Sequence, residues 1–339
     1  MAMIDAGTDR RLDVMPYAPP RRVTEVYTDD QINRIFAAIR RLGPIQQQLG
    51  RYPQAAEGRV IEPVFRGELA LETICYDASV EDVFFNSKLM RWARDYRESD
   101  YCIPRQLAFN LSVPCASYDV PHIDSPAFRG LWHVNTPPWL LNVIGFSKLF
   151  TAYQTKMVQI LAWFWRGLHG GFTYWPEGVH GDPQRVPAPV WNTGLVAENQ
   201  YMYHRMESAL PPGEDHRIPR LTAQSTIEAD STHADGWLVR TEGESVARFR
   251  TEELRLMVHW SCEIFRDMAE VRRHFAGADP LTHRMVIDGL VEDLRALGID
   301  YKASDDALGD PKFKALLERH YWVDPPNNYP SEAPIGFRR

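Results

Sequence analysis

The segment at residues 118–130 places a histidine and an aspartate at a spacing suited to holding one metal ion. It reads YDVPHIDSPAFRG, with His122 and Asp124 two residues apart. In an extended chain, residues i and i+2 point to the same side, so this imidazole and this carboxylate can face one ion together. Two ligands make only part of a metal site. The rest of the chain must therefore supply a third.

The His-x-Asp pattern occurs three times, so the surrounding sequence must select among the copies. His180-x-Asp182 lies in a loop rich in Gly and Pro, and His233-x-Asp235 lies in the segment STHADG. Both are typical of turns. The first copy alone follows a strand-like alternation, QLAFNLSV at residues 106–113. We therefore expect the first copy to be the functional one.

A third ligand should be a histidine on another strand, followed by groups that carry positive charge. His204 meets this description because it ends the strand-like segment 195–203. Arg217 and Arg220 follow it across a turn. His259, the one plausible partner for the second His-x-Asp copy, falls within a segment that we interpret as a helix.

Composition excludes several classes of protein. The chain of 339 residues has a net charge of −7, which provides no broad positive field for a nucleic acid backbone. The N-terminus lacks the apolar segment of a signal peptide, and no run approaches the roughly 18 apolar residues of a membrane span. We expect a soluble, cytoplasmic protein. The four cysteines form no Cys-x-x-Cys pair and predict neither a zinc ribbon nor a thioredoxin-type site: Cys75, Cys102, Cys115 and Cys262.

The length allows one large domain or two ordinary ones, and we expect one elaborated domain. Residues 1–25 predict a surface arm, residues 26–300 a single domain, and residues 301–339 a tail that packs back on the body. Within the domain we expect a β core at about 60–250 and a helical flank at 252–298. The sequence predicts helices over 28–43, 83–96, 252–271 and 282–297, and a helix or covering loop over 139–152. It predicts strands over 60–76, 106–113, 157–165, 194–206 and 221–227. A hairpin is expected to join 157–165 to 172–175. The rings of Trp163, Trp165, Tyr174 and Trp175 are expected in the core.

The order of these parts resembles the iron(II)/2-oxoglutarate-dependent oxygenases, the broad superfamily that includes phytanoyl-CoA hydroxylase-like and taurine dioxygenase-like proteins. The resemblance covers residues 106–227: a strand, His122-x-Asp124, a covering segment, a hairpin, Asn199-x4-His204 and arginine beyond. It implies a mainly β fold with flanking helices (α+β) around a double-stranded β-helix core, also called a jelly roll or cupin-like fold.

The resemblance also implies the cofactors. Two imidazoles and one carboxylate on one face of iron(II) leave three positions open, which can take a bidentate 2-oxo acid and dioxygen. By this resemblance His122, Asp124 and His204 bind Fe(II), and 2-oxoglutarate and O2 are the co-substrates. A guanidinium suits the distal carboxylate of 2-oxoglutarate. Arg220 is the first choice for this role and Arg217 the second.

Other features narrow the reaction without fixing it. Asn110 and Tyr118, near the first ligands, are further candidates for hydrogen bonds to the co-substrate. Asp124 argues against halogenation, because halogenating relatives carry a small residue at this position. Hydroxylation, desaturation or cyclisation of a small, partly apolar organic molecule remains, and the oligomeric state is open, a homo-oligomer included.

Three alternatives differ in their chemistry. A non-heme iron oxidase would use the same metal without 2-oxoglutarate. A non-catalytic small-molecule-binding β-barrel protein would need no metal at all. Finally, His122 and Asp124 can be a surface pair in a turn, with His204 a buried histidine of a sheet.

Overall fold

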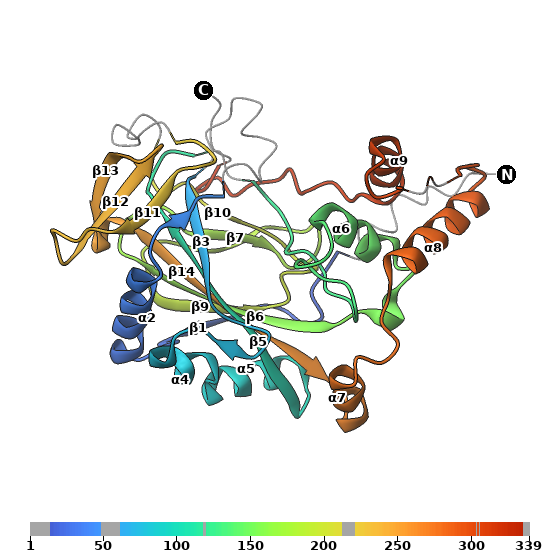
Figure 1. The fold of residues 1–339 in the computed structure, drawn as a ribbon, viewed down its shortest axis with the longest axis horizontal. Coiled ribbons are helices and arrows are strands. Elements are labelled where there is room, and N and C mark those ends of the chain that lie inside the picture. Colours follow the sequence, from blue (N-terminus) through green and yellow to red (C-terminus); the bar gives the residue numbers. More distant parts are fainter. Residues whose placement is uncertain are drawn as a thin grey trace.

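A seven-stranded antiparallel sheet forms the centre of the protein (Figure 1). The computed structural model describes residues 14–48, 62–117, 120–211, 221–302, 304 and 306–334. Antiparallel sheets with several helices agree with the predicted mainly β fold. In spatial order the strands of the large sheet are β1 (Arg21–Thr24), β9 (Val190–Ala197), β6 (Lys156–Trp165), β14 (Arg255–Phe265), β5 (Tyr101–Ser112), β3 (Val64–Leu71) and β4 (Ile74–Cys75).

Two smaller sheets accompany the large one. The three-stranded sheet contains β10 (Tyr203–Met206), β7 (Phe172–Trp175) and β8 (Gln184–Val186), in that order. It lies against the inner face of the large sheet, and buried rings and aliphatic side chains from both sheets form one apolar cluster between them. The four-stranded sheet contains β13 (Glu244–Arg250), β12 (Gly236–Thr241), β11 (Thr226–Ala229) and β2 (Ile45–Gln46).

The chain alternates between the large and the three-stranded sheet instead of forming the predicted hairpin. β6 pairs with β14 and β9, whereas β7 pairs with β10 and β8. The segment 166–171 therefore carries the chain across to the opposite sheet, and the hairpin prediction was wrong. The predicted strand over 194–206 is likewise divided between the two sheets as β9 and β10.

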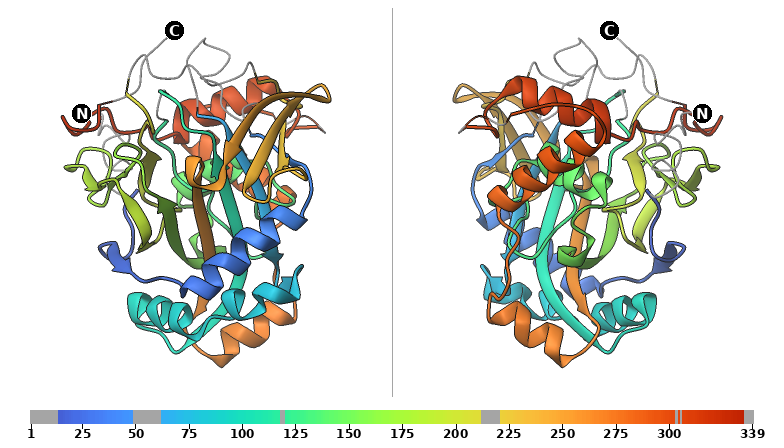
Figure 2. Two further views of the ribbon diagram at one scale, coloured as in Figure 1. Left: turned by 90° about the vertical axis from the view of Figure 1, so that its left-hand side faces the viewer. Right: turned by 90° about the vertical axis from the view of Figure 1, so that its right-hand side faces the viewer.

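Helices cover the outer face of the large sheet (Figures 1 and 2). α2 (Asp29–Arg41), α4 (Glu81–Phe84) and α5 (Ser87–Arg97) bury their apolar sides there. α2 lies in the helix predicted over 28–43 and begins with a capping box, in which Thr28 and Gln31 satisfy each other's backbone N–H groups. Asp29 and Asp30 in its first turn also complement the helix dipole.

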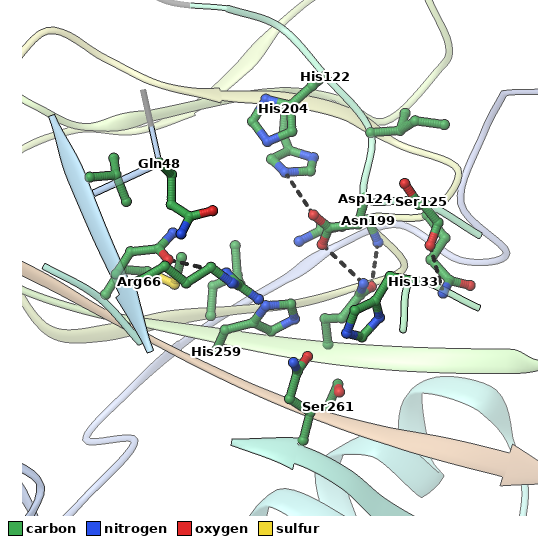
Figure 3. Close-up of a pocket in the computed structure, with 18 of the residues that line it drawn as sticks. Gln48, Arg66, His122, Asp124, Ser125, His133, Asn199, His204, His259 and Ser261 are labelled. Atoms are coloured by element: carbon green, nitrogen blue, oxygen red, sulfur yellow. Dashed lines mark hydrogen bonds and ion pairs between the residues drawn. The ribbon is translucent and has the colours of Figure 1, made fainter. Parts of the chain in front are cut away.

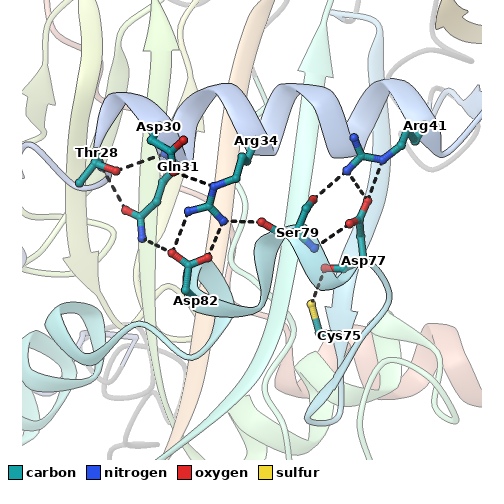
Figure 4. A network of polar contacts seen from close by, with 9 residues as sticks. All are labelled: Thr28, Asp30, Gln31, Arg34, Arg41, Cys75, Asp77, Ser79 and Asp82. Carbon is teal, nitrogen blue, oxygen red and sulfur yellow. Dashed lines mark hydrogen bonds and ion pairs between the residues drawn. The ribbon is translucent and has the colours of Figure 1, made fainter.

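Polar contacts fasten the solvent side of α2 to the segment that leads into α4 (Figure 4). Arg34 contacts Asp30 at 2.8 Å and donates a 2.9 Å hydrogen bond to Asp82, and Arg41 contacts Asp77 at 2.6 Å. The hydrogen bond from Arg34 lowers the pKa of Asp82 to about 2. Because these side chains are partly exposed, water and salt weaken the contacts. They fix the orientation of α2, while apolar burial supplies most of its stability.

A second apolar cluster lies at the other end of the molecule. It is built from α6 (Pro138–Ser147), α8 (His283–Ala296) and α9 (Pro311–Tyr321). α8 confirms the helix predicted over 282–297, with Thr282 as its N-cap. The predicted tail packs back on the body, and it contains α9, a helix that was not predicted from the sequence.

The segment after Glu252 is the largest error in the predicted elements. A helix was expected over 252–271, but residues 255–265 form the central strand β14, and only α7 (Met268–Phe275) is helical. The five apolar residues that alternate along β14 pack on the helical side: Leu256, Val258, Trp260, Cys262 and Ile264. The residues between them face the other way. This period of two is typical of a strand whose two faces pack against different surroundings.

The N-terminal arm also needs correction. Arg21–Thr24 form the edge strand β1, paired with β9, and Val14 is buried. Residues before 14 lie outside the described part. The cysteines at 75, 102, 115 and 262 are free thiols. Among the described residues, no helix is both long and apolar enough to cross a membrane.

Removing the N-cap of α2 should lower stability measurably. Replacing Thr28 by Ala leaves backbone N–H groups of the first turn unsatisfied, and we expect the free energy of unfolding to fall by about 1 kcal/mol in chemical denaturation. Ser87→Ala is the matched control, since Asn86, and not Ser87, caps α5. Equal losses in the two variants would contradict the role of the capping box.

Candidate metal centre

Two main-chain hydrogen bonds hold the two candidate histidines side by side. The backbone N–H of His122 donates to the carbonyl of His204 and the N–H of His204 donates back, each at 2.9 Å. Asp124 continues the pairing, because its N–H donates to the carbonyl of Asn199 at 3.0 Å. The segment after Val120 therefore lies beside β10 as an added edge, and the imidazole centroids are 4.5 Å apart.

The side chains of His122, Asp124 and His204 converge on one point (Figure 3). One nitrogen or oxygen atom from each lies within 4.8 Å of the others, which is the only such cluster of three or more His, Cys, Asp or Glu side chains found in the described part of the chain. Nε2 of His204 is 3.9 Å from Oδ1 of Asp124. Two metal–ligand bonds of about 2.0–2.2 Å can span this distance. The fold therefore brings together the three side chains that the sequence nominated as ligands.

Backbone carbonyls fix which ring nitrogen each histidine offers to a metal. Nδ1 of His122 is 2.9 Å from the carbonyl of Val120, and Nδ1 of His204 is 2.9 Å from the carbonyl of Met202. A carbonyl only accepts hydrogen bonds, so each Nδ1 carries a proton, and Nε2 is the nitrogen that offers a lone pair in the neutral ring. Such contacts are the usual means of orienting a metal-binding imidazole.

The charge states also suit a divalent cation. Burial, strengthened by the proximity of His122, lowers the pKa of His204 to about 4, so this imidazole is neutral at pH 7. Burial alone would raise the pKa of Asp124, but the nearby His204, His259, His122 and Arg66 outweigh it and leave this pKa below its usual value. Asp124 is therefore a carboxylate, with 31% of its side chain exposed, and it lines the cavity.

Gln159 on β6 holds the carboxylate in place. Its Nε2 donates to Oδ2 of Asp124 at 3.0 Å, and its Oε1 accepts from the backbone N–H of Asn199 at 2.7 Å. The side chain is only 3% exposed. One amide thus connects the large sheet, the metal-binding carboxylate and the turn that leads into His204. No pattern in the sequence predicted this role of Gln159.

The triad opens onto a cavity of about 620 Å³ between the sheets. The wall contributed by the three-stranded sheet includes Phe172 and Met206 beside His204. The large sheet contributes a polar floor and several apolar side chains: Arg66, Glu68, Asn110, Met157, Gln159, Leu161, Met257, His259 and Ser261. The cavity therefore has apolar side chains on part of its wall and many polar and charged groups on the rest.

The other His-x-Asp copies are turns, as predicted. His180 and Asp182 are exposed in one turn, and His233 is exposed in another, where it contacts Asp230. His259 was misplaced. It lies on β14, not on a helix, and its buried ring faces the cavity, where burial lowers its pKa to about 4.

The structure places the other predicted residues as follows. Asn110 lies on β5, lines the cavity and accepts a hydrogen bond from Arg66 at 3.1 Å. Tyr118, Arg217 and Arg220 lie outside the described residues, so their predicted contacts with a co-substrate remain predictions. The rings expected in the core are there, buried in two apolar clusters: Trp163, Trp165, Tyr174 and Trp175.

Comparisons with known proteins give matches to solved structures only. No model of a known protein family and no curated protein matches the chain. One similar structure is SnoK, a non-heme alpha ketoglutarate dependent carbocyclase from nogalamycin biosynthesis, with 10% identity, a TM-score of 0.41, and coverage of 83% of this chain and 94% of that chain. A 2OG-Fe(II) oxygenase family oxidoreductase from Burkholderia pseudomallei has 10% identity and a TM-score of 0.39, with coverage of 78% and 94%.

A third structure was determined with ligands. HygX from Streptomyces hygroscopicus, with nickel, 2-oxoglutarate and hygromycin B bound, is 9% identical with a TM-score of 0.38, covering 73% of this chain and 83% of that chain. These proteins carry the name or co-substrate of the family that the sequence motif resembles. Because the TM-scores lie below 0.5, we base the function of this chain on its own site residues.

Replacing Gln159 should weaken metal binding without removing a ligand. In Gln159→Leu, Asp124 loses the donor that orients it, and we expect iron(II) affinity to fall about 10- to 100-fold by titration. Gln106→Leu is the matched control. Gln106 lines the same cavity but donates to Glu68 and not to Asp124, so Gln106→Leu should bind iron(II) within about 2-fold of the wild-type affinity. Unchanged affinity in Gln159→Leu would show that Asp124 is held by other contacts.

Proposed function

We propose that the protein is an iron(II)- and 2-oxoglutarate-dependent oxygenase that oxidises a small, partly apolar organic molecule. The observation that carries this proposal is the convergence of two imidazoles and one carboxylate at the wall of a cavity between two sheets. A facial set of two histidines and one carboxylate leaves coordination positions for a 2-oxo acid and dioxygen.

The arrangement of strands supports the same proposal. We propose that the large and three-stranded sheets together form the double-stranded β-helix implied by the sequence resemblance. From β6 onward the chain runs from the large sheet to β7 and β8, returns to β9, crosses to β10 and finally enters β14 in the large sheet. The hairpin-containing segment of β11–β13 is then an insertion between the strand that bears His204 and the strand that bears His259.

Each residue of the triad has a defined task in this proposal. His122 and His204 donate their Nε2 lone pairs to the metal while backbone carbonyls hold their Nδ1–H groups, and Asp124 supplies the one negative charge. Phe172 packs against the ring of His204, with centroids 5.5 Å apart, and limits its rotation. When bound, iron(II) supplies dioxygen activation coupled to oxidative decarboxylation of 2-oxoglutarate to succinate and carbon dioxide.

The cavity positions the substrate and restricts water. Apolar side chains from both sheets, including Met157, Leu161 and Met206, form part of its wall. Its volume of about 620 Å³ lies within the range for small-molecule sites. We propose that a five-carbon oxo acid occupies the end with the triad and that the organic substrate lies toward the outer part of the cavity. Hydroxylation, desaturation and cyclisation all follow from the same positioning of a C–H bond.

The proposed activity can be tested by following succinate release. Wild-type protein supplied with iron(II), ascorbate and 2-oxoglutarate should release succinate slowly in the absence of substrate, and His122→Ala should lower this rate at least about 100-fold through loss of iron. His180→Ala and His233→Ala are matched controls, since each removes a histidine of a similar sequence pattern outside the triad.

The outcomes separate the alternatives. If wild type binds iron(II) and 2-oxoglutarate does not change the absorption spectrum of that iron, an oxidase that takes its electrons from the substrate is favoured. If iron(II) with 2-oxoglutarate leaves the melting temperature unchanged, a metal-free binding protein is favoured, because a ligand that binds only the folded state raises stability. Loss of iron in the His180 control as well as in His122→Ala would contradict the assigned triad.

A further inference from the structure

The floor of the cavity is a patch of the large sheet whose residues lie in rows across neighbouring strands. In one row Arg66 of β3 pairs with Asn110 of β5, which pairs with Met257 of β14. In the adjacent row, Glu68 of β3 pairs with Ala108 of β5, which pairs with His259 of β14. Directly paired residues point to the same face of a sheet, so all of these side chains face the cavity side.

Arg66 and Glu68 both lie in this patch, but Glu68 accepts a hydrogen bond from Gln106 and makes no ion pair with Arg66. The one hydrogen bond of Arg66 in the described part of the chain goes to the neutral side chain of Asn110, and Arg66 forms no ion pair with a described residue. The other arginine that lines the cavity is different, since Arg105 contacts both Glu72 and Glu263. A guanidinium with most of its donors uncommitted in a cavity is suited to a carboxylate, which it can bind through two parallel hydrogen bonds.

His259 is a second group in the same patch that lacks a partner. Its side chain is only 7% exposed, and no described group forms a hydrogen bond with Nε2. A buried polar atom of this kind usually has a partner, and a missing one can be a ligand atom. The small side chain of Ala108 beside it leaves room for Arg66 to extend across β5, and Figure 3 shows Arg66 pointing toward His259.

The triad and this patch line one cavity from different strands (Figure 3). A dicarboxylic oxo acid that binds a metal through its 2-oxo acid end must place its second carboxylate within the same space. We propose that Arg66, oriented by Asn110 and assisted by His259, binds the distal carboxylate of 2-oxoglutarate. This inference rests on the proposed function. From the sequence, this role was expected of Arg220 or Arg217. The proposal assigns it instead to Arg66, on a strand that precedes the metal-binding motif.

The test compares two oxo acids that differ only at the distal end. 2-Oxopentanoate has a methyl group where 2-oxoglutarate has its distal carboxylate, so the ratio of their affinities reports on the distal site alone. The affinities are measured by titrating iron(II)-loaded protein without oxygen and following the absorbance of the metal–oxo acid chelate. The measurement requires no turnover and no knowledge of the organic substrate.

We expect wild type to prefer 2-oxoglutarate over 2-oxopentanoate and Arg66→Met to lose about 10- to 100-fold of that preference. Affinities for iron(II) and 2-oxopentanoate should stay within about 2-fold, which shows that Arg66→Met still folds. Arg66→Lys keeps the charge without the planar pair of donors, and we expect it to lose an intermediate part of the preference for 2-oxoglutarate. Arg166→Met is the matched control, because Arg166 is exposed outside the cavity and stacks on Trp191.

Arg220→Met and Arg217→Met complete the experiment. If either variant loses the preference while Arg66→Met keeps it, the assignment to Arg66 is wrong, although the proposed function stands. An unchanged preference in Arg66→Met overturns the assignment by itself, and Arg66 would then be available to a carboxylate of the organic substrate. Absence of iron(II) binding in wild type would overturn the proposed function together with the inference.

Discussion

The pair of backbone hydrogen bonds between His122 and His204 is the contact on which the proposed metal centre depends. The two residues are far apart in the sequence, and neither imidazole could be placed by local structure alone. Once the two backbones are paired, both rings lie on the same side, and Asp124 follows at the next position on that side. The remaining contacts, from backbone carbonyls and from Gln159, refine an arrangement that main-chain pairing has already produced.

The parts of the fold that the sequence predicted are those set by local chemistry. The helices that start near Thr28 and Thr282 and the strand alternation before His122 were visible because neighbouring residues determine them. β14 was misread as a helix because it is buried along its whole length and carries apolar residues at consecutive positions, such as Met257 and Val258. Burial on both faces hides the period of two.

Features that depend on strand pairing were beyond the reach of sequence patterns. Nothing local indicates that the chain after Trp165 crosses to another sheet, or that Gln159 will meet Asp124. Arg66 was overlooked for the same reason, because only the register of β3 against β5 and β14 brings it to the cavity. The triad was found because its spacing is partly local and because its third member lies on a recognisable strand.

The two faces of β14 have a consequence for how the protein can diverge. One face carries the apolar residues that pack against the helices, and the other presents Met257, His259 and Ser261 to the cavity. Substitutions at Met257 and Ser261 can change which substrates the cavity accepts while the residues that pack against the helices stay the same. Natural variation or directed evolution can therefore alter substrate choice on one side of a single strand.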